Sequence, residues 1–383
     1  MTIFTETTAV YLDYNATAKV RPEAITAMVR ALEFTGNPSS AHASGRAARA
    51  MVETARAEVA ALAGAAPAII TFLSGGAEAN ALAINSAVAA GFTRVIIGAV
   101  EHDTVRETVL AGGRPVAIWP VDANGVADLA WLQRELAAGG EGRPLVCLML
   151  ANNETGVIQP VAEAAAMVRA ASGWLHVDAV QAAGKIAIDI EALGADTLGL
   201  SAHKIGGPQG VGALLAGPRA TIVRQLHGGG QERGRRAGTE NVPGIAAFGA
   251  AAKATLADLP RLAADTAGRD AFEAAVAMAG AEVLGAAVAR LPQTSCFAAP
   301  GFASELQVIS LDLASIRVSA GAACSSGKVK ASPVVAAMGR PDLAPFSIRV
   351  SGGWATTAAD WSRCAEAWLK LNERRAARRL EVA

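Results

Sequence analysis

WLHVDAVQAAGKIAIDIEALGADTLGLSAHKIGGPQGVGALLAG, residues 174–217, is the stretch that decides the fold of this chain. Its first apolar segment stops at Asp178, and its second is followed closely by Lys204. Open α/β sheets bind their ligands just beyond the ends of such strands, so we expect Asp178 and Lys204 to meet at one edge of a sheet. Three short apolar segments predict buried strands: 174–177, 197–201 and 211–215.

An aspartate and a lysine in this arrangement are what pyridoxal phosphate requires. The lysine forms a Schiff base, and the carboxylate keeps the pyridine nitrogen protonated so that the ring accepts electrons. Either residue alone would more simply be a solvated loop charge. Glycines at 206, 207, 210 and 212 follow Lys204 closely, and glycine lets the backbone approach a ligand. Together these features favour a cofactor site.

The composition favours a large globular protein without a polyanionic partner. The chain has 383 residues, enough for two domains, and its 34 basic and 34 acidic residues give a net charge of zero. Neither nucleic acid nor a membrane surface is favoured by this charge. Hydrophobic residues make up 52 % of the chain but occur in short segments, without an uninterrupted apolar run of about 18 residues. We therefore expect a soluble protein.

The N-terminus and the cysteines indicate a cytoplasmic location. The first residues, MTIFTETTAVYLDYN, lack the basic start and apolar run of a secretion signal. The four cysteines are far apart and form no Cys-x-x-Cys pair, which favours free thiols in a reducing compartment, without disulfides or a zinc site.

Strand-like and helical patterns alternate through the first two thirds of the chain. Helices are expected at 22–34 and 46–63, and the alternation that follows predicts a mainly parallel sheet with helices on both faces. We expect a large α/β domain at 16–255 and a small α+β domain made of 1–15 and 256–383. Strands are predicted at 68–73, 94–100, 145–151, 174–177, 197–201 and 211–215.

Polar or glycine-rich segments follow these strands. SGGAEANALAINSAV follows Leu73, EHDTV follows Val100 and NNETG follows Ala151, in addition to the Asp178 and Lys204 segments. One such loop would be ordinary turn chemistry. Five in succession indicate a single ligand site at one edge of the sheet.

Three of these loops offer individual candidates. Ser74 to Glu78 leads into an alanine-rich helix whose free N–H groups could cradle a phosphate, although a glycine-rich turn that caps a helix is equally consistent. His102 could stack on an aromatic ring or shuttle protons, or be a polar loop residue. Asn153 could bond a ring oxygen, but Asn-Asn is also a common turn.

The C-terminal part begins with a glycine- and arginine-rich loop at 226–244 that could hold phosphate, form a subunit interface or simply be solvated. Residues 246–289 are expected to be almost wholly helical. Beyond them the patterns predict strands at 294–298, 316–318 and 346–351, a helix at 333–338 and a charged terminal helix.

Two residues of this part are candidates for chemistry. Cys324 lies in SAGAACSSGK, where small neighbours offer little to bury a thiol, and thiolate reactivity requires exposure. A small buried cysteine is the alternative. Arg349 alternates with apolar residues in FSIRVS, so it should point inward and bind a carboxylate, either in a salt bridge or on a ligand.

Considered together, these motifs resemble the pyridoxal-phosphate-dependent cysteine desulfurases of the NifS/IscS type, within the class V aminotransferase superfamily. The resemblance runs in order from Tyr11 to Ser351. It implies the fold type I of pyridoxal-phosphate-dependent transferases, with a mainly parallel seven-stranded sheet and a small C-terminal α+β domain. The matching segments are YLDYNATA, GNPSSAH, EHDTV, NNETGVIQP, HVDAVQAAGK, SAHKIGGPQGVGAL, HGGGQERGRRAGTENV, SAGAACSSG and SIRVS.

The resemblance assigns roles to the residues around the cofactor. It implies that Lys204 forms the Schiff base, Asp178 pairs with the pyridinium nitrogen, and His102 stacks on the ring and assists proton transfer. Gln181 would bond the ring hydroxyl, and Asn153 would contact cofactor and substrate. The phosphate would be held by Ser201, His203, the turn at Gly76 and Ala77, and Thr239.

The resemblance also implies a homodimer, in which Thr239 comes from the other subunit. Arg349 would bind the carboxylate of L-cysteine. Lys204 would remove the Cα proton, and the Cys324 thiolate would attack the substrate sulfur, releasing L-alanine and leaving a persulfide on Cys324. The sulfur would pass to an acceptor or iron–sulfur scaffold protein for iron–sulfur cluster assembly or other thiolation. No resident metal is implied, although Cys324 could ligate an iron–sulfur cluster transiently through its persulfide.

The chain departs from the family pattern at the phosphate turn. The usual Ser-Gly-Ala-Thr-Glu-Ser reads SGGAEA here, so Ala77 replaces a threonine hydroxyl. Gln231 stands where a histidine is common, and Arg235 adds a charge nearby. GKVKAS, after Cys324, is more basic than usual and could alter which acceptor docks.

Two other functions share part of this pattern. A selenocysteine lyase or another class V aminotransferase would use Lys204 and Asp178, but a transaminase has no use for Cys324. A non-catalytic sulfur-relay scaffold is suggested by Ala77, and it would be colourless because it holds no cofactor.

Overall fold

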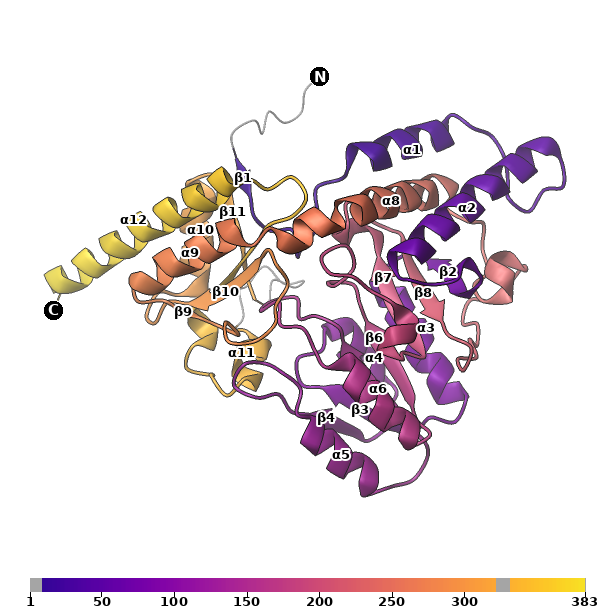
Figure 1. The fold of residues 1–383 in the computed structure, drawn as a ribbon, viewed down its shortest axis with the longest axis horizontal. Helices are drawn as coiled ribbons and strands as arrows, with labels where there is room; N and C mark the ends of the chain where they lie inside the picture. The colour runs from indigo at the N-terminus through magenta and orange to yellow at the C-terminus, as the bar shows by residue number, and fades with distance from the viewer. Residues whose placement is uncertain (1–8, 322–330, 383) are drawn as a thin grey trace.

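The computed structural model describes residues 9–321 and 331–382. Two groups of elements lie side by side, one around a large sheet and one around a smaller sheet, and the long helix α8 packs on the larger group beside α1 and α2 and leads toward the smaller one (Figure 1). Each group has a hydrophobic core of its own. The division at residue 255 stays a prediction; that residue lies within α8 (Val242–Ala264).

A seven-stranded sheet forms the centre of the larger group, as predicted. Only β8 runs antiparallel to its neighbours, so the sheet is mainly parallel. Its strands, in spatial order, are β2 (Ile70–Leu73), β8 (Gly212–Ala216), β7 (Thr197–Ser201), β6 (Trp174–Asp178), β5 (Pro144–Met149), β3 (Arg94–Gly98) and β4 (Val116–Trp119).

The edge strand β4 was not among the predicted strands. Only Trp119 of its four residues is fully buried, and Ile118 is exposed. A half-exposed edge strand lacks the continuous apolar run by which the buried strands were recognised.

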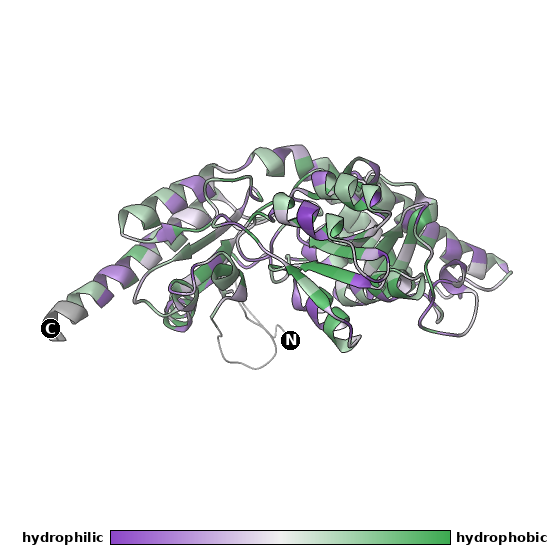
Figure 2. Ribbon diagram, turned by 90° about the horizontal axis from the view of Figure 1, so that it is seen from below, coloured by the Kyte–Doolittle hydropathy of each residue, from purple (hydrophilic) through white to green (hydrophobic). Residues whose placement is uncertain are grey.

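Helices cover both faces of this sheet. Figure 2 shows mostly hydrophobic strands and hydrophilic residues along the outer helices. α2 and α8 cross at close range: a Cβ on Gly249 would lie 2.5 Å from Cα of Ala55, so only glycine fits at this position. These helices are α1 (Pro22–Leu32), α2 (Ala43–Leu62), α3 (Gly76–Ala89), α4 (Asp103–Ala111), α5 (Leu129–Ala137), α6 (Val161–Ala170), α7 (Ile190–Leu193) and α8.

The smaller group is built on an antiparallel sheet in the order β12, β13, β10, β9, with β1 and β11 paired beside it in parallel. Aromatic contacts such as Phe297 on Trp368 fill its core. Its elements are β1 (Val10–Tyr11), α9 (Ala267–Met278), β9 (Glu282–Val283), β10 (Thr294–Ala298), α10 (Ser304–Leu313), β11 (Ile316–Arg317), β12 (Ser319–Ala320), α11 (Pro333–Ala337), β13 (Ser347–Ser351) and α12 (Ala358–Val382).

The expectation of nearly continuous helix over 246–289 is confirmed as far as Met278, apart from a break at residues 265–266, and is wrong beyond it. α8 ends at Ala264, α9 ends at Met278, and β9 follows. Gly280 has φ +87°, a left-handed conformation that stops α9 and that the alanine-rich composition did not reveal. Within the described ranges, no helix combines the length and apolar character needed to cross a membrane.

Candidate functional site

The loops that follow the strands of the large sheet enclose a cavity of about 450 Å³. This volume lies within the range of small-molecule sites. The cavity brings together residues from five loops because the carboxyl ends of β3, β5, β6 and β7 lie at one edge of the sheet. The strands β8 and β2 continue this edge. Nine of the residues predicted for the site line it: Gly76, Ala77, His102, Asn153, Asp178, Gln181, Ser201, His203 and Lys204.

Asp178 ends β6 and is only 6 % exposed. Its Oδ2 accepts a hydrogen bond from Asn80 Nδ2 at 2.8 Å, and its Oδ1 accepts one from the backbone N–H of Val180 at 2.9 Å. Asn80 comes from α3 and is fully buried. Both carboxylate oxygens are therefore held in place before any ligand binds.

His176 lies behind Asp178 and keeps Asn80 in this orientation. Its Nε2 is 3.1 Å from Asn80 Oδ1, and its Nδ1 is 3.0 Å from Thr197 Oγ1. Burial lowers the pKa of His176 to about 4, so the ring is neutral at physiological pH. Since the amide oxygen accepts, Nε2 carries the proton and Nδ1 accepts from the threonine hydroxyl.

Lys204 ends the short helical turn that follows β7. Its Nζ donates to the backbone carbonyl oxygens of Asn15 at 2.6 Å and Ala16 at 2.9 Å. These carbonyls come from the segment after β1, so the N-terminal strand segment forms part of the site.

His102 precedes α4 and caps its N-terminus. Its Nδ1 accepts from the backbone N–H of Thr104 at 3.1 Å. The Thr104 hydroxyl in turn accepts from Asn80 at 2.9 Å, which links His102 to the same network as Asp178. With Nδ1 engaged as an acceptor, the neutral ring carries its proton on Nε2.

The N-terminus of α3 forms another wall of the cavity. Its first residues, Gly76 and Ala77, present free backbone N–H groups and the positive end of the helix dipole, as an anion site requires. A side chain at Gly76 would meet Val180 at 2.9 Å. Burial, with the charge of Lys204, lowers the pKa of His203 to about 4, and its Nδ1 is 3.0 Å from Thr17 Oγ1.

Thr239 does not line this cavity. It lines a second cavity of about 220 Å³, together with Ser74 and Gly210, which border both cavities. The loop that carries Thr239 is fixed by Glu232, whose carboxylate forms a bidentate pair with Arg56, both bonds 2.8 Å long.

Arg349 of β13 is 5 % exposed and is held next to the cavity rather than in its wall. It donates to Asp13 Oδ1 at 2.7 Å and to the carbonyl oxygen of Asn153 at 3.0 Å. Its buried Nε has no hydrogen-bond partner within the described ranges. The carboxylate expected for this inward arginine is thus Asp13, which sequence reasoning did not identify.

Glu101 is a further buried acid that sequence reasoning missed, although it stands in the quoted segment EHDTV. Its Oε1 accepts from the backbone N–H of Met149, and its Oε2 has no partner in the described part of the chain. Burial, and next the charge of Asp178, raise the pKa of Glu101 to about 8, so it is mostly protonated at pH 7.

The shifted pKa of Glu101 predicts a pH-dependent stability. Between its ordinary pKa of 4.5 and about 8, the folded chain binds more protons than the unfolded chain. The proton-linked stabilisation is therefore full at low pH and is lost as the pH rises toward 8. We expect Glu101→Gln, which stays neutral, to flatten the fall in melting temperature of the cofactor-free protein over this window. The exposed control Glu305→Gln should keep the wild-type slope, and equal slopes for all three proteins would contradict the assignment.

Cys324 lies outside the described residues. The other three cysteines are buried: Cys147, Cys296 and Cys364 have exposures of 0, 2 and 0 %. Burial raises the pKa of all three thiols, that of Cys364 to about 12. None of these three can supply a thiolate at neutral pH.

Comparisons with known proteins agree with this geometry. The sequence model of the aminotransferase class-V family matches residues 10–363. The chain is 42 % identical to the cysteine desulfurase of Cereibacter sphaeroides, over 93 % of this chain and 94 % of that protein. It is 38 % identical to the cysteine desulfurase IscS of Dictyoglomus turgidum, over 92 % and 91 % of the two chains. A solved NifS-like protein from Rickettsia africae superposes with a TM-score of 0.86 at 32 % identity, over 95 % of this chain and 99 % of that one. The chain therefore belongs to the class-V aminotransferase family, among its cysteine desulfurases of the NifS/IscS type.

Proposed function

We propose that this protein is a pyridoxal-phosphate-dependent cysteine desulfurase that converts L-cysteine to L-alanine and leaves a persulfide on Cys324. The observation that carries the proposal is the cavity lined by both Asp178 and Lys204, because a buried carboxylate and an amine are the two groups this cofactor requires. The relatives named cysteine desulfurase support the choice of substrate.

The residues present fit the cofactor. Asp178 would face the pyridine nitrogen, Lys204 would bind the aldehyde carbon, and the N-terminus of α3 would receive the phosphate, with Ser201 and His203 beside it. Ala77 supplies only its backbone N–H there. Bound pyridoxal phosphate supplies an electron sink for the electron pair left at the substrate Cα.

Proton transfer would fall to Lys204 and His102. The Asn15 and Ala16 carbonyls hold Lys204 Nζ at the cavity wall, where it would take the Cα proton. His102 has its Nδ1 engaged at the start of α4, so its Nε2 is the ring atom that would exchange protons.

Arg349 would bind the carboxylate of L-cysteine. Asp13 and the Asn153 carbonyl fix two of its nitrogens, and Nε remains as a buried donor that an incoming carboxylate could satisfy. Asn153 itself lines the cavity, so the carboxylate site and the cofactor site adjoin.

Cys324 would then take the sulfur. Its thiolate attacks the substrate sulfur, an S–S bond forms as the Cβ–S bond breaks, and the electron pair of the broken bond stays with the carbon fragment that becomes alanine. The buried state of the other three cysteines supports Cys324 as the nucleophile. The persulfide would pass to an acceptor or iron–sulfur scaffold protein in the cytoplasm, for cluster assembly or other thiolation.

We also propose a homodimer in which Thr239 of one subunit binds the phosphate in the other. Thr239 does not line the cofactor cavity of its own chain, and this supports a contribution to the other subunit, as the resemblance implies.

The direct test is the reaction itself. Purified protein saturated with pyridoxal phosphate should release alanine from L-cysteine in the presence of a reductant. If the protein is yellow but releases no alanine, a transaminase or a lyase acting on another amino acid becomes the better proposal. If the protein binds no cofactor, the sulfur-relay scaffold becomes the better proposal.

The pair between Asp13 and Arg349 predicts a change in substrate affinity. Asp13→Asn keeps the size of the side chain but removes the charge that holds the guanidinium, so the KM for L-cysteine should rise about tenfold with a smaller change in kcat. Asp312→Asn is the matched control, because Asp312 pairs with Arg317 on the exposed surface. An unchanged KM in Asp13→Asn would contradict this role.

A further inference from the structure

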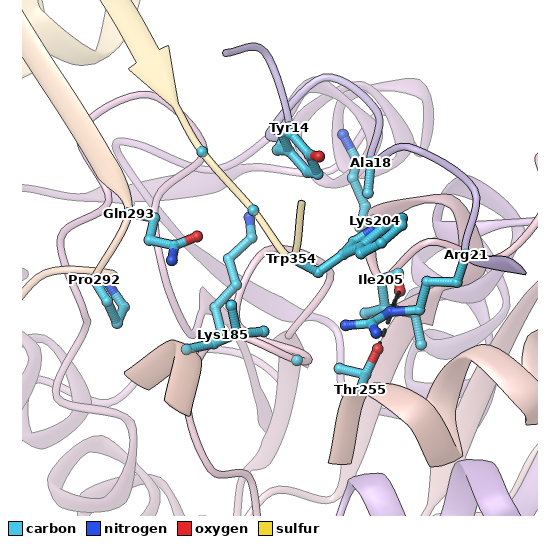
Figure 3. Close-up of a pocket in the computed structure, with 14 residues that line it drawn as sticks. Tyr14, Ala18, Arg21, Lys185, Lys204, Ile205, Thr255, Pro292, Gln293 and Trp354 are labelled. Atoms are coloured by element: carbon cyan, nitrogen blue, oxygen red, sulfur yellow. Dashed lines mark hydrogen bonds between the residues drawn. The ribbon is translucent and has the colours of Figure 1, made fainter. Parts of the chain in front are cut away.

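Lys185 is a lysine next to the site to which neither the sequence nor the comparisons give a role. It lines a small pocket of about 30 Å³ that adjoins the cofactor cavity, since Lys204 lines both. Figure 3 shows Lys185 extending through this pocket below Tyr14 and beside Gln293. Its Nζ donates to Asn15 Oδ1 at 2.6 Å and to Gln181 Oε1 at 2.8 Å.

The amide of Asn15 is oriented by a backbone carbonyl group, which cannot change polarity. Its Nδ2 donates to the backbone carbonyl oxygen of Asn153 at 3.1 Å, and this oxygen can only accept. The same Nδ2 donates to Thr294 Oγ1 at 3.1 Å. Asn15 is 1 % exposed, so a flipped amide would leave buried groups unpaired. Asn15 must therefore present Oδ1 to Lys185.

Lys185 then fixes the orientation of the Gln181 amide. Lys185 offers N–H donors to both amide oxygens, so Gln181 presents Oε1 to it. Gln181 Nε2 in turn donates to the backbone carbonyl oxygen of Asn15 at 2.9 Å. Because one N–H of Nε2 is used there, the second N–H is the polar group that Gln181 has left for the cofactor cavity, which it lines.

We propose that Lys185 is a positioning residue that fixes the amide of Gln181 so that it offers a hydrogen-bond donor, and no acceptor, to the ring oxygen of the cofactor. This inference rests on the proposed function. A donor at that position stabilises the ionised ring oxygen, whereas a flipped amide would place its own oxygen against it. The orientation of the Gln181 amide thus favours the ionised form of the ring oxygen.

The electrostatics agree with this geometry. Burial, followed by the charges of Lys204 and Arg349, lowers the pKa of Lys185 well below its usual 10.5. The amine donates to both amide oxygens in either protonation state, so the geometry does not depend on its charge.

A double-mutant cycle tests the proposal with cofactor affinity as the readout. Lys185→Met keeps the length of the side chain and removes the donors, and we expect the Kd for pyridoxal phosphate to rise about tenfold. The pH midpoint of the cofactor's visible absorbance should rise by about one unit, because the ring oxygen loses its donor. Lys253→Met, at an exposed lysine, is the control and should change neither.

The cycle distinguishes positioning from general damage to the site. In a Gln181→Ala background, Lys185→Met should cause little further loss of affinity, since Lys185 acts through Gln181. Additive losses would overturn the proposal, as would a Lys185→Met protein with wild-type affinity and absorbance.

Gln181→Glu gives an independent result should Lys185→Met fail to fold. It replaces the donor with an acceptor and should weaken cofactor binding at least as much as Gln181→Ala. Wild-type affinity in Gln181→Glu would overturn the donor assignment. If wild-type protein itself bound no pyridoxal phosphate, the proposed function would fail, which is a separate outcome.

Discussion

Cys324→Ala is expected to abolish alanine release from L-cysteine while leaving cofactor binding intact. Removing a nucleophile that no neighbour can replace typically costs at least about a thousandfold in kcat. No neighbour should replace it here, because the other three cysteines are at most 2 % exposed and their thiols have raised pKa values. The measurement is alanine formed per bound cofactor, with reductant present, for the variant and the wild type side by side.

Cys364→Ala is the matched control for this variant. Cys364 packs in the core of the smaller group, so its loss should lower the melting temperature but not the alanine formed per folded, cofactor-loaded molecule. Mass analysis after a single turnover without reductant should find one additional sulfur on the peptide that contains Cys324. Full activity in Cys324→Ala would exclude the persulfide route and favour another class V activity.

The buried strands of both sheets were predictable from their apolar runs. Thr197–Ser201 and Thr294–Ala298 have the predicted bounds, since a continuous apolar run between polar or turn residues marks a buried strand. The approach of the site loops also followed from topology, because parallel strands place their carboxyl ends at one edge. The half-exposed β4 carried no such signal.

The partners of the buried polar groups were not predictable in this way. Asp13 meets Arg349 across 336 residues, and Asn15 meets Lys185 across 170. The sequence pattern around a polar residue does not reveal which distant element that residue contacts. The motif YLDYNATA could therefore be matched to the family, but the contacts of its polar residues could not be predicted. The segment 9–17 joins the cofactor loops to the C-terminal sheet, since Asn15 Nδ2 bonds both Asn153 and Thr294.

Lys204→Ala is expected to remove both the covalent cofactor and the activity. Borohydride treatment of the wild type should attach the reduced cofactor to the peptide that carries Lys204, and the variant should carry none. Alanine release should fall at least about a thousandfold, since the variant would also lack the group proposed as the base for the Cα proton. The measurement is peptide mapping after reduction, together with alanine formation.

Lys185 is the amine that could complicate this result, because it also lies beside Gln181. Its Nζ is held by Asn15 Oδ1 and Gln181 Oε1, and Lys185 does not line the cofactor cavity, so it should not replace Lys204. Lys253→Ala, at an exposed lysine, should keep both the adduct and the activity. An adduct on Lys185 in the Lys204→Ala protein would show that this amine reaches the cofactor cavity, which would contradict its fixed position on the two amide oxygens. If the adduct forms only on Lys204 in the wild type and is lost in Lys204→Ala, Lys185 does not bind the cofactor covalently. Any role of Lys185 would then depend on its hydrogen bonds to the two amide oxygens.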